Sequence, residues 1–265
     1  MQPFLTANWR YLAMLNYTVD PAILAPFVPP GTEIDFENST TYVSIVGLLF
    51  RDTRLLGLPI PRHRDFEEVN LRFYVRKKSA DTWRRGVVFI REMVPRYAVA
   101  LVARACYGEN YFAVPMKHHI EHVKAGISDK ATTSSLPPGE PRAQSAAVRA
   151  VEPDLKVEYS WRRNTRKWES LRMAATGEAR PIPAGSHAEF ITEHYWGYTR
   201  VRNRCNEYRV EHPRWKIWET EDFSLDADIT TLYGEQFVET LSAQPRSAFI
   251  ADGSAITIAH RSILL

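Results

Sequence analysis

Hydrophobic and polar residues alternate most regularly between positions 66 and 75 of this chain, which predicts a β-strand with two chemically different faces. The apolar face carries Val69, Leu71, Phe73 and Val75. The polar face carries Glu68, Asn70, Arg72 and Tyr74. If that polar face looks into a cavity, its side chains can bind a small polar ligand or transfer protons. If it looks into solvent, it is only the wet face of an antiparallel sheet.

Similar patterns predict the other elements of the chain. Further strands are expected at residues 42–50, 86–94, 156–161, 207–210, 215–218, 247–251 and 255–259. Helices are expected at residues 21–27 behind an Asp20 cap, at 97–107, through Phe190 and Ile191, and at 226–241. Strands outnumber helices, so the expected fold class is α+β and β-rich, with helices at the margins.

Residues 126–153 are the one stretch with the composition of a linker. The part from Thr132 to Pro141 is rich in Ser, Thr and Pro and has few apolar side chains to bury. The strand pattern resumes after this stretch without a change in composition. We therefore expect a mobile loop at 126–153 inside one domain that spans residues 1–265, rather than a boundary between two domains.

The composition is that of an ordinary globular protein, with 45% apolar and 25% charged residues among 265. The net charge of +3 results from 34 basic and 31 acidic residues, an excess too weak to indicate nucleic-acid binding. Residues 161–168 interleave basic and aromatic side chains, but turn-forming residues at their centre favour an exposed hairpin. No apolar run of about 18 residues and no signal-like start is present, so we expect a soluble, cytoplasmic protein without membrane contact.

A histidine-rich segment, His118-His119-Ile120-Glu121-His122, matches the H-x-x-E-H pattern of a zinc-peptidase helix. Pro115 before the segment and Gly126 after it disfavour a helix of the required length. In a strand, His118 and His122 would lie about 13 Å apart, which is too far to share one ion. We therefore expect no bound metal.

Other catalytic motifs are missing from the sequence. It contains neither G-x-G-x-x-G nor a Walker lysine loop, so we expect no nucleotide and no other cofactor. Ser254 does not belong to a G-x-S-x-G elbow, and residues 252–254 have the composition of a hairpin turn. Cys106 and Cys205 lie far apart and outside any C-x-x-C pair, so they are expected to be idle thiols.

Two further clusters mix catalytic residue types with aromatic rings. Residues 190–199 contain Glu193, Tyr195 and Tyr198, and Arg51 directly follows a buried strand. Around a barrel, such side chains are candidates for ligand contacts. The alternatives are an aromatic rim in which Glu193 pairs with an arginine, and a solvated strand end for Arg51.

Three segments carry a resemblance to a known family. The polar strand follows the pattern F-x-E-x-N-x-R-x-Y-V with Phe66, Glu68, Asn70, Arg72, Tyr74 and Val75. The pattern T-E-x-Y-x-x-Y-T is matched by Thr192, Glu193, Tyr195, Tyr198 and Thr199, and H-P-x-W by His212, Pro213 and Trp215. The chain resembles the YqjF-like family of the acetoacetate-decarboxylase-like superfamily over nearly its whole length.

The resemblance implies a closed, antiparallel, cone-like β-barrel with flanking helices and an active site in its lumen. The decarboxylases use a lysine of lowered pKa that forms a Schiff base with a β-keto acid. Their lysine segment, similar to G-R-E-x-x-G-F-P-K-K, falls on residues 108–117 of this chain. The nucleophile then falls on Met116, which cannot form an imine, and Lys117 takes the helper position on the opposite face of a strand. Acetoacetate decarboxylation is therefore not expected.

The leading interpretation is a protein that binds an anionic or carbonyl-bearing organic ligand in the barrel lumen, as a lyase, hydrolase or isomerase that forms no Schiff base. Arg72 would hold the anion, and Glu68, expected to be kept ionised by that charge, would act as acid or base. Asn70 and Tyr195 would orient the ligand. Further candidate ligand contacts are Tyr74, Met116, Glu193, Tyr198 and Arg51, and Lys117 is a third catalytic candidate.

Two other functions stay open at this point. One is a non-enzymatic protein that binds a ligand in the same pocket, and the other is a structural or interaction protein whose polar rows form internal ion pairs. The expected partner is a small organic molecule rather than nucleic acid or a membrane. The sequence leaves open whether the chain forms an oligomer.

Overall fold

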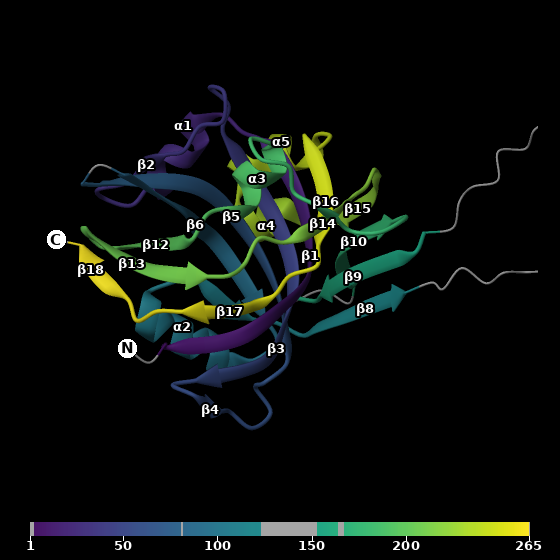
Figure 1. Ribbon diagram of the computed structural model, residues 1–265, viewed down its shortest axis with the longest axis horizontal. Coiled ribbons are helices and arrows are strands. Elements are labelled where there is room, and N and C mark those ends of the chain that lie inside the picture. Colours follow the sequence, from purple (N-terminus) through teal and green to yellow (C-terminus); the bar gives the residue numbers. More distant parts are fainter. Residues whose placement is uncertain (1–2, 81, 123–152, 164–166, 265) are drawn as a thin grey trace, which may run out of the picture.

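Seven strands of the described residues close into a barrel (Figure 1). The computed structural model describes residues 3–80, 82–122, 153–163 and 167–264. Of the loop expected at 126–153, residues 126–152 therefore lie outside the described residues. The barrel strands are β1 (Leu5–Thr18), β3 (Tyr42–Leu55), β5 (Phe66–Ser79), β6 (Thr82–Val94), β12 (Trp196–Val201), β13 (Arg204–Glu211) and β17 (Ala255–Ile258). Their order around the ring is β1, β17, β13, β12, β6, β5, β3, and the ring closes because β3 pairs with β1.

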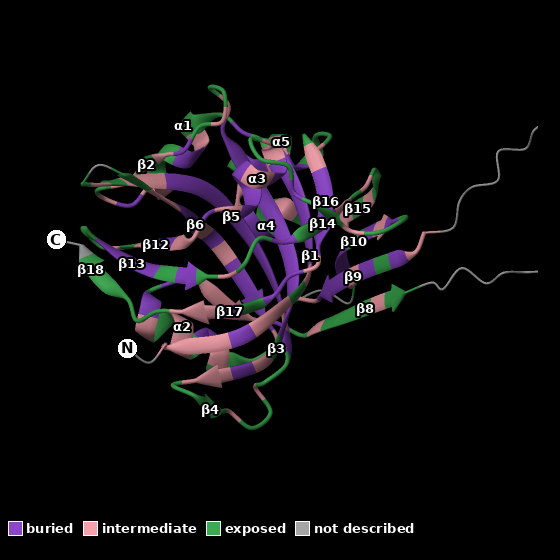
Figure 2. Cartoon of the chain, in the orientation of Figure 1, coloured by how far each residue is buried: buried purple, intermediate pink, exposed green. Residues whose placement is uncertain are grey.

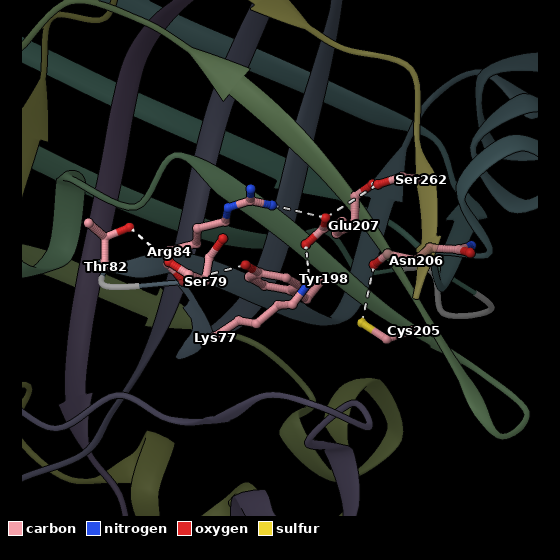
Figure 3. Close-up of polar contacts among 9 residues, drawn as sticks. All are labelled: Lys77, Ser79, Thr82, Arg84, Tyr198, Cys205, Asn206, Glu207 and Ser262. Atoms are coloured by element: carbon pink, nitrogen blue, oxygen red, sulfur yellow. Dashed lines mark hydrogen bonds and ion pairs between the residues drawn. The ribbon is translucent and has the colours of Figure 1, made fainter. Parts of the chain in front are cut away.

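The ring has one weak seam. Its neighbouring strands are antiparallel, as expected, except that β6 and β12 run parallel and pair only through Gly86 with Trp196 and Val87 with Gly197. Near this seam the carboxylate of Glu207 accepts from Lys77 Nζ at 3.0 Å and from Arg84 at 3.1 Å (Figure 3). These ion pairs join β13 to the β5–β6 hairpin where backbone pairing is shortest.

Shorter strands extend the barrel at its edges, and a second sheet lies outside it. The extensions are β2 (Glu33–Ile34), β4 (Leu58–Pro59), β7 (Tyr111–Ala113), β11 (Arg180–Pro181), β14 (Lys216–Glu219), β16 (Ser247–Ala251) and β18 (Ser262–Leu264). The second sheet contains β8 (Met116–His122), β9 (Leu155–Trp161), β10 (Glu169–Ala175) and β15 (Asp222–Asp226). The ring of Tyr159 in β9 lies directly on Gly47 of β3, where any side chain would collide with it. The Tyr159 hydroxyl also donates to the Tyr11 carbonyl at 2.8 Å, which anchors the second sheet on the barrel.

The helices are short and lie at the margins. They are α1 (Pro21–Leu24), η1 (Ala25–Phe27), α2 (Tyr97–Tyr107), α3 (His187–Thr192), α4 (Ile229–Tyr233), η2 (Glu235–Phe237) and α5 (Val238–Ser242). The expectation of a single helix at 226–241 is wrong. The observed helical segment begins after the Asp228 cap and is interrupted at Gly234, whose φ of +103° is outside the helical region.

Three other segments singled out in the sequence have different outcomes. Residues 252–254 are not a hairpin turn, because β16 and β17 do not pair with each other and both pair with β1. Strands β9 and β10 pair antiparallel on either side of the hairpin expected at 161–168, of which residues 164–166 lie outside the described residues and Trp161 is buried rather than exposed. The histidine-rich segment is the largely exposed strand β8 rather than a helix. None of the helices described here has the length and apolar character needed to cross a membrane.

Strand β5 is buried on both faces, and this places its polar row inside the barrel. Its apolar face belongs to a core shared with Tyr159 and Trp161 of the second sheet. Its other face looks into the lumen beside Val46 and Leu48 of β3. Figure 2 shows the middle of β5 buried and β8 exposed along most of its length. The relative exposure is 3% for Glu68, 3% for Asn70 and 8% for Arg72.

The ion pairs at the seam predict a stability effect. Glu207→Gln keeps the shape of the side chain but removes the charge that two cations share, so the free energy of unfolding should fall by about 1.5–3 kcal/mol. Urea denaturation would measure it, with the exposed Glu219→Gln as a control that stays within about 0.5 kcal/mol of the wild type. Equal stability of the two variants would show that the seam does not depend on Glu207.

Candidate functional site

The barrel lumen holds a cavity of about 170 Å³ with mainly apolar walls and a few polar groups. Its apolar lining includes Leu12, Val46, Leu48, Phe50, Phe66 and Trp215. Its polar lining combines Glu68, Asn70 and Arg72 of β5 with Glu92 of β6, Glu109 after α2, Tyr111 of β7, Tyr208 of β13, and His194 and His212. An apolar cavity with a few convergent polar groups is typical of a small-molecule site.

Glu68 is held by two hydrogen bonds within the cavity wall. Asn70 Nδ2 donates to its Oε1 at 2.9 Å, and the Tyr111 hydroxyl donates to its Oε2 at 2.7 Å. Burial raises the pKa of Glu68 to about 7, and the bonds from Tyr111 and Asn70 and the charge of Arg72 only partly oppose this. The expectation that Arg72 keeps Glu68 ionised is therefore wrong, because desolvation outweighs the attraction.

Two more buried carboxyl groups lie in the same wall. Glu92 faces Asn70 across the β5–β6 pairing, and Glu109 follows Gly108, which ends α2 with a φ of +77°. Burial raises the pKa of Glu109 to about 8, against the hydrogen bond that the Tyr208 hydroxyl donates to it. Burial, and then the charges of Glu109 and Glu68, raise the pKa of Glu92 well above its usual range. The wall thus holds protonated carboxyl groups near neutral pH.

Arg72 is the guanidinium among the cavity-lining residues, and no carboxylate is paired with it in the described structure. Its contacts are the Ile191 carbonyl at 3.4 Å, the Met14 sulfur at 3.9 Å and the face of Tyr74, with its carbon 5.7 Å from the ring centroid. Its Nε has no hydrogen-bond partner. A buried cation without a counterion is costly and suits an anionic group of a ligand.

His194 adds a neutral acceptor beside Arg72. Its Nε2 lies 3.2 Å from Asp35 Oδ2, and Arg85 Nε donates to the same oxygen at 2.7 Å. Burial lowers the pKa of His194 to about 4 despite the bond to Asp35, so the ring is neutral at pH 7. With its proton on Nε2, facing Asp35, its Nδ1 is a bare acceptor without a partner.

Several sequence candidates lie outside the cavity lining. Tyr74 is buried next to it, where its hydroxyl lies 2.6 Å from Ser44 Oγ and its ring packs on His194. Tyr195 donates to Glu193, which also lies 3.9 Å from Arg214, in agreement with the alternative of a rim carboxylate paired with an arginine. Tyr198 belongs to the core outside the lumen, where its hydroxyl donates to the Arg84 carbonyl at 3.4 Å (Figure 3).

The end of the decarboxylase-like segment, which carries the two positions aligned with the lysine pair, lies outside the lumen. Met116 and Lys117 belong to β8 in the second sheet, and Met116 packs at the edge of the outer core. Lys117 is exposed, with its Nζ 4.6 Å from the centroid of the Trp168 ring. Arg51 is exposed as well, at a shallow surface hollow with His118. Among the described residues, no lysine lines the cavity.

Sequence reasoning missed Glu92, Glu109, Tyr111, Tyr208 and His194. Strict alternation would place Glu92 on the same face as Val88 and Ile90, which belong to the outer core. The lumen is lined instead by Val87 and Phe89, so alternation predicts that Glu92 points away from the lumen. A bulge between the pairs at Leu71 and Arg72 inserts one extra residue in β6 and turns Glu92 inward. Two signals were available for Glu109: it directly follows a helix-ending glycine, and it lies in the segment 108–117 that aligns with the decarboxylase lysine segment.

A family model described as "Uncharacterized conserved protein", DUF2071, matches residues 6–255. The chain belongs to the DUF2071 family. Uncharacterized protein YqjF of Bacillus subtilis (strain 168) is 26% identical over 221 residues, which are 81% of this chain and 75% of that protein. These findings confirm the family expected from the sequence motifs.

Solved structures support the barrel assignment for this DUF2071 protein. The acetoacetate decarboxylase of Legionella pneumophila aligns with a TM-score of 0.62 at 14% identity, covering 99% of this chain and 87% of that one. The enduracididine biosynthesis enzyme MppR complexed with pyruvate aligns with a TM-score of 0.61 at 13% identity, covering 100% and 92%. At these identities the likeness shows the fold alone, which is the acetoacetate-decarboxylase-like barrel expected above.

The raised pKa of Glu109 predicts a pH dependence of stability. An unfolded glutamate titrates near 4.5 and the folded Glu109 near 8, so between these values the folded protein holds a proton that the unfolded chain has lost. Stability should therefore fall as the pH rises through this window, by at most about 1.4 kcal/mol per pH unit for this group. Glu109→Gln keeps the oxygen that accepts from Tyr208 and should lose this component, so thermal unfolding from pH 5 to pH 8.5 should show a flatter profile.

The exposed Glu178→Gln variant is the matched control and should retain the wild-type profile. A wild-type stability that rises across the same pH range, with no difference between the two variants, would show that Glu109 is ionised in the folded protein.

Proposed function

We propose that this protein binds a small carboxylic acid bearing a carbonyl group in its barrel lumen and acts on it by acid–base chemistry without a Schiff base. The observation that carries the proposal is the buried Arg72, which lies in the lumen without a carboxylate partner and lines the same cavity as Glu68. A guanidinium binds a carboxylate through two parallel hydrogen bonds, and its free Nε is one of the required donors.

Glu68 has the properties of a general acid or base in this arrangement. Its pKa of about 7 allows both the protonated and the ionised form at neutral pH, which is the condition for efficient proton transfer. Tyr111 and Asn70 fix the carboxyl group, and Asn70 Oδ1 is still available to accept a hydrogen bond. A lyase, hydrolase or isomerase step that moves a proton next to a carbonyl would fit these groups.

One structural relative supports the proposed ligand class. MppR, a protein of similar fold, is described as complexed with pyruvate, a small carbonyl acid of the kind proposed here.

The second candidate function is a binding protein without catalysis, favoured by the absence of a lysine from the described cavity lining. Consumption of a bound acid, followed by NMR, would separate the enzyme from the binding protein.

Binding of pyruvate tests the role of Arg72. Arg72→Gln removes the charge and the fork of donors, so pyruvate affinity measured by calorimetry should fall roughly 10- to 100-fold. Arg72→Lys should recover only part of the loss, because an ammonium cannot form both parallel bonds. Acetone, which has no carboxylate, should bind far more weakly than pyruvate to the wild type.

The exposed Arg204→Gln variant is the matched control and should bind pyruvate like the wild type. Circular dichroism of each variant would establish that it is folded. Equal pyruvate affinity in Arg72→Gln and the wild type, or no affinity in either, would refute the proposed site.

The position of Lys117 predicts that no imine forms with β-keto acids. Its amine lies on the exposed side of β8 against Trp168, outside the lumen, where it cannot reach a ligand bound in the cavity. Incubation with acetoacetate and borohydride should leave the intact mass unchanged. Acetoacetate decarboxylase is the positive control, and its mass should increase under the same conditions. A trapped adduct that maps to Lys117 would contradict the proposal and restore Schiff-base chemistry.

A further inference from the structure

The cavity wall contains a second polar end, with Glu92 at its centre. Glu92 is 1% exposed and lines the cavity, yet neither of its carboxyl oxygens has a hydrogen-bond partner. A buried polar group without a partner costs free energy, so its presence in a cavity wall indicates that something else satisfies it. The question is which chemical group of a ligand would do so.

Neither oxygen of Glu92 has a hydrogen-bond partner, and the Tyr111 hydroxyl that lies near it only partly opposes the rise of its pKa. Tyr111 pairs with Glu92 in the β6–β7 register, but its hydroxyl donates its single proton to Glu68. The Tyr208 hydroxyl of β13 donates its proton to Glu109. Glu68 and Glu109 themselves add like charges when ionised. Arg72 of β5 lines the same cavity, two residues beyond the Asn70 that pairs with Glu92, but none of the ion pairs described for this structure joins it to Glu92.

The lumen is therefore rich in acid at one end and basic at the other. Three carboxyl groups, Glu68, Glu92 and Glu109, line it together with one guanidinium, Arg72. Asn70 lies opposite Glu92, and Arg72 is two residues further along the same face of β5, a step of about 7 Å. A ligand of a few carbon atoms can span this distance.

We propose that the ligand of this cavity is a short zwitterion, whose carboxylate binds Arg72 and whose cationic nitrogen binds the carboxyl group of Glu92. The inference rests on the function proposed above and specifies its substrate class as a carboxylic acid with an amino or guanidino group a few atoms away. An ammonium or guanidinium group supplies the N–H donors that Glu92 lacks, and its positive charge stabilises the ionised form of Glu92.

Proton release should accompany the binding of such a cation. In the empty cavity the carboxyl groups are protonated at neutral pH because burial and their mutual repulsion disfavour the ions. A bound cation reverses this balance, so about one proton should leave the wall for each zwitterion bound. A ligand with the carboxylate alone should release none at this end of the cavity.

Matched pairs of ligands test the proposal. Calorimetry would compare γ-aminobutyrate with butyrate, and β-alanine with propionate, in two buffers of different ionisation enthalpy. For at least one pair the zwitterion should bind roughly 10- to 100-fold more tightly than the plain acid and release about one proton. In Glu92→Gln, which keeps the shape of the side chain, both the difference in affinity and the proton release should be lost.

The outcomes separate this inference from the proposed function. If the plain acids and pyruvate bind but the zwitterions gain nothing, the zwitterion inference is overturned and the carboxylate site at Arg72 stands. If pyruvate, the plain acids and the zwitterions all fail to bind, the proposed function itself fails. A zwitterion advantage that persists in Glu92→Gln would overturn the assignment to Glu92, and Glu178→Gln is the folded control that should behave like the wild type.

Discussion

Burial of both faces of β5 is the constraint on which the rest of the site depends. Hydrophobic packing of its apolar face under Tyr159 and Trp161 requires its polar face to turn into the barrel. Gly47 contributes to this packing, because the Tyr159 ring occupies the space that a side chain there would need. The second sheet therefore does more than cover the barrel, since it fixes the orientation of the strand that carries Glu68, Asn70 and Arg72.

Desolvation then controls the chemistry of the lumen. Coulombic attraction alone would make Glu68 an ion beside Arg72, but the loss of water raises the pKa of its carboxyl group to about 7. The same effect acts on Glu92 and Glu109, which also repel each other. At one end of the lumen the guanidinium of Arg72 can bind an anion. At the other end the carboxyl groups of Glu92 and Glu109 are protonated, and therefore neutral, in the empty cavity. Such a wall can discriminate among ligands by their charge at both ends.

The comparison with fold relatives shows how one barrel can serve different chemistry. The chain shares the fold of acetoacetate decarboxylases at 14% identity or less among the structures compared. Its own segment 108–117 leaves the lumen after Glu109 and Tyr111, and it carries Met116 and Lys117 into the outer sheet. The lumen then keeps carboxyl groups and an arginine without an amine nucleophile among the described lining residues, which directs attention to proton transfer rather than imine formation.

The sequence by itself determined the strand character of β5, its two faces, the bounds of α2 at Tyr97–Tyr107 and the family. These depend on local periodicity, helix-ending residues and short motifs, which are properties of neighbouring residues. That reasoning did not predict three features: the break in the helix at Gly234, the inward turn of Glu92 at a bulge, and the long strand β1. The tertiary structure alone decided which carboxyl groups lose their water, because desolvation depends on every element packed around a side chain. It also decided that Glu193, Tyr195 and Tyr198 lie outside the cavity lining, since closure of the ring sets which side chains face the lumen.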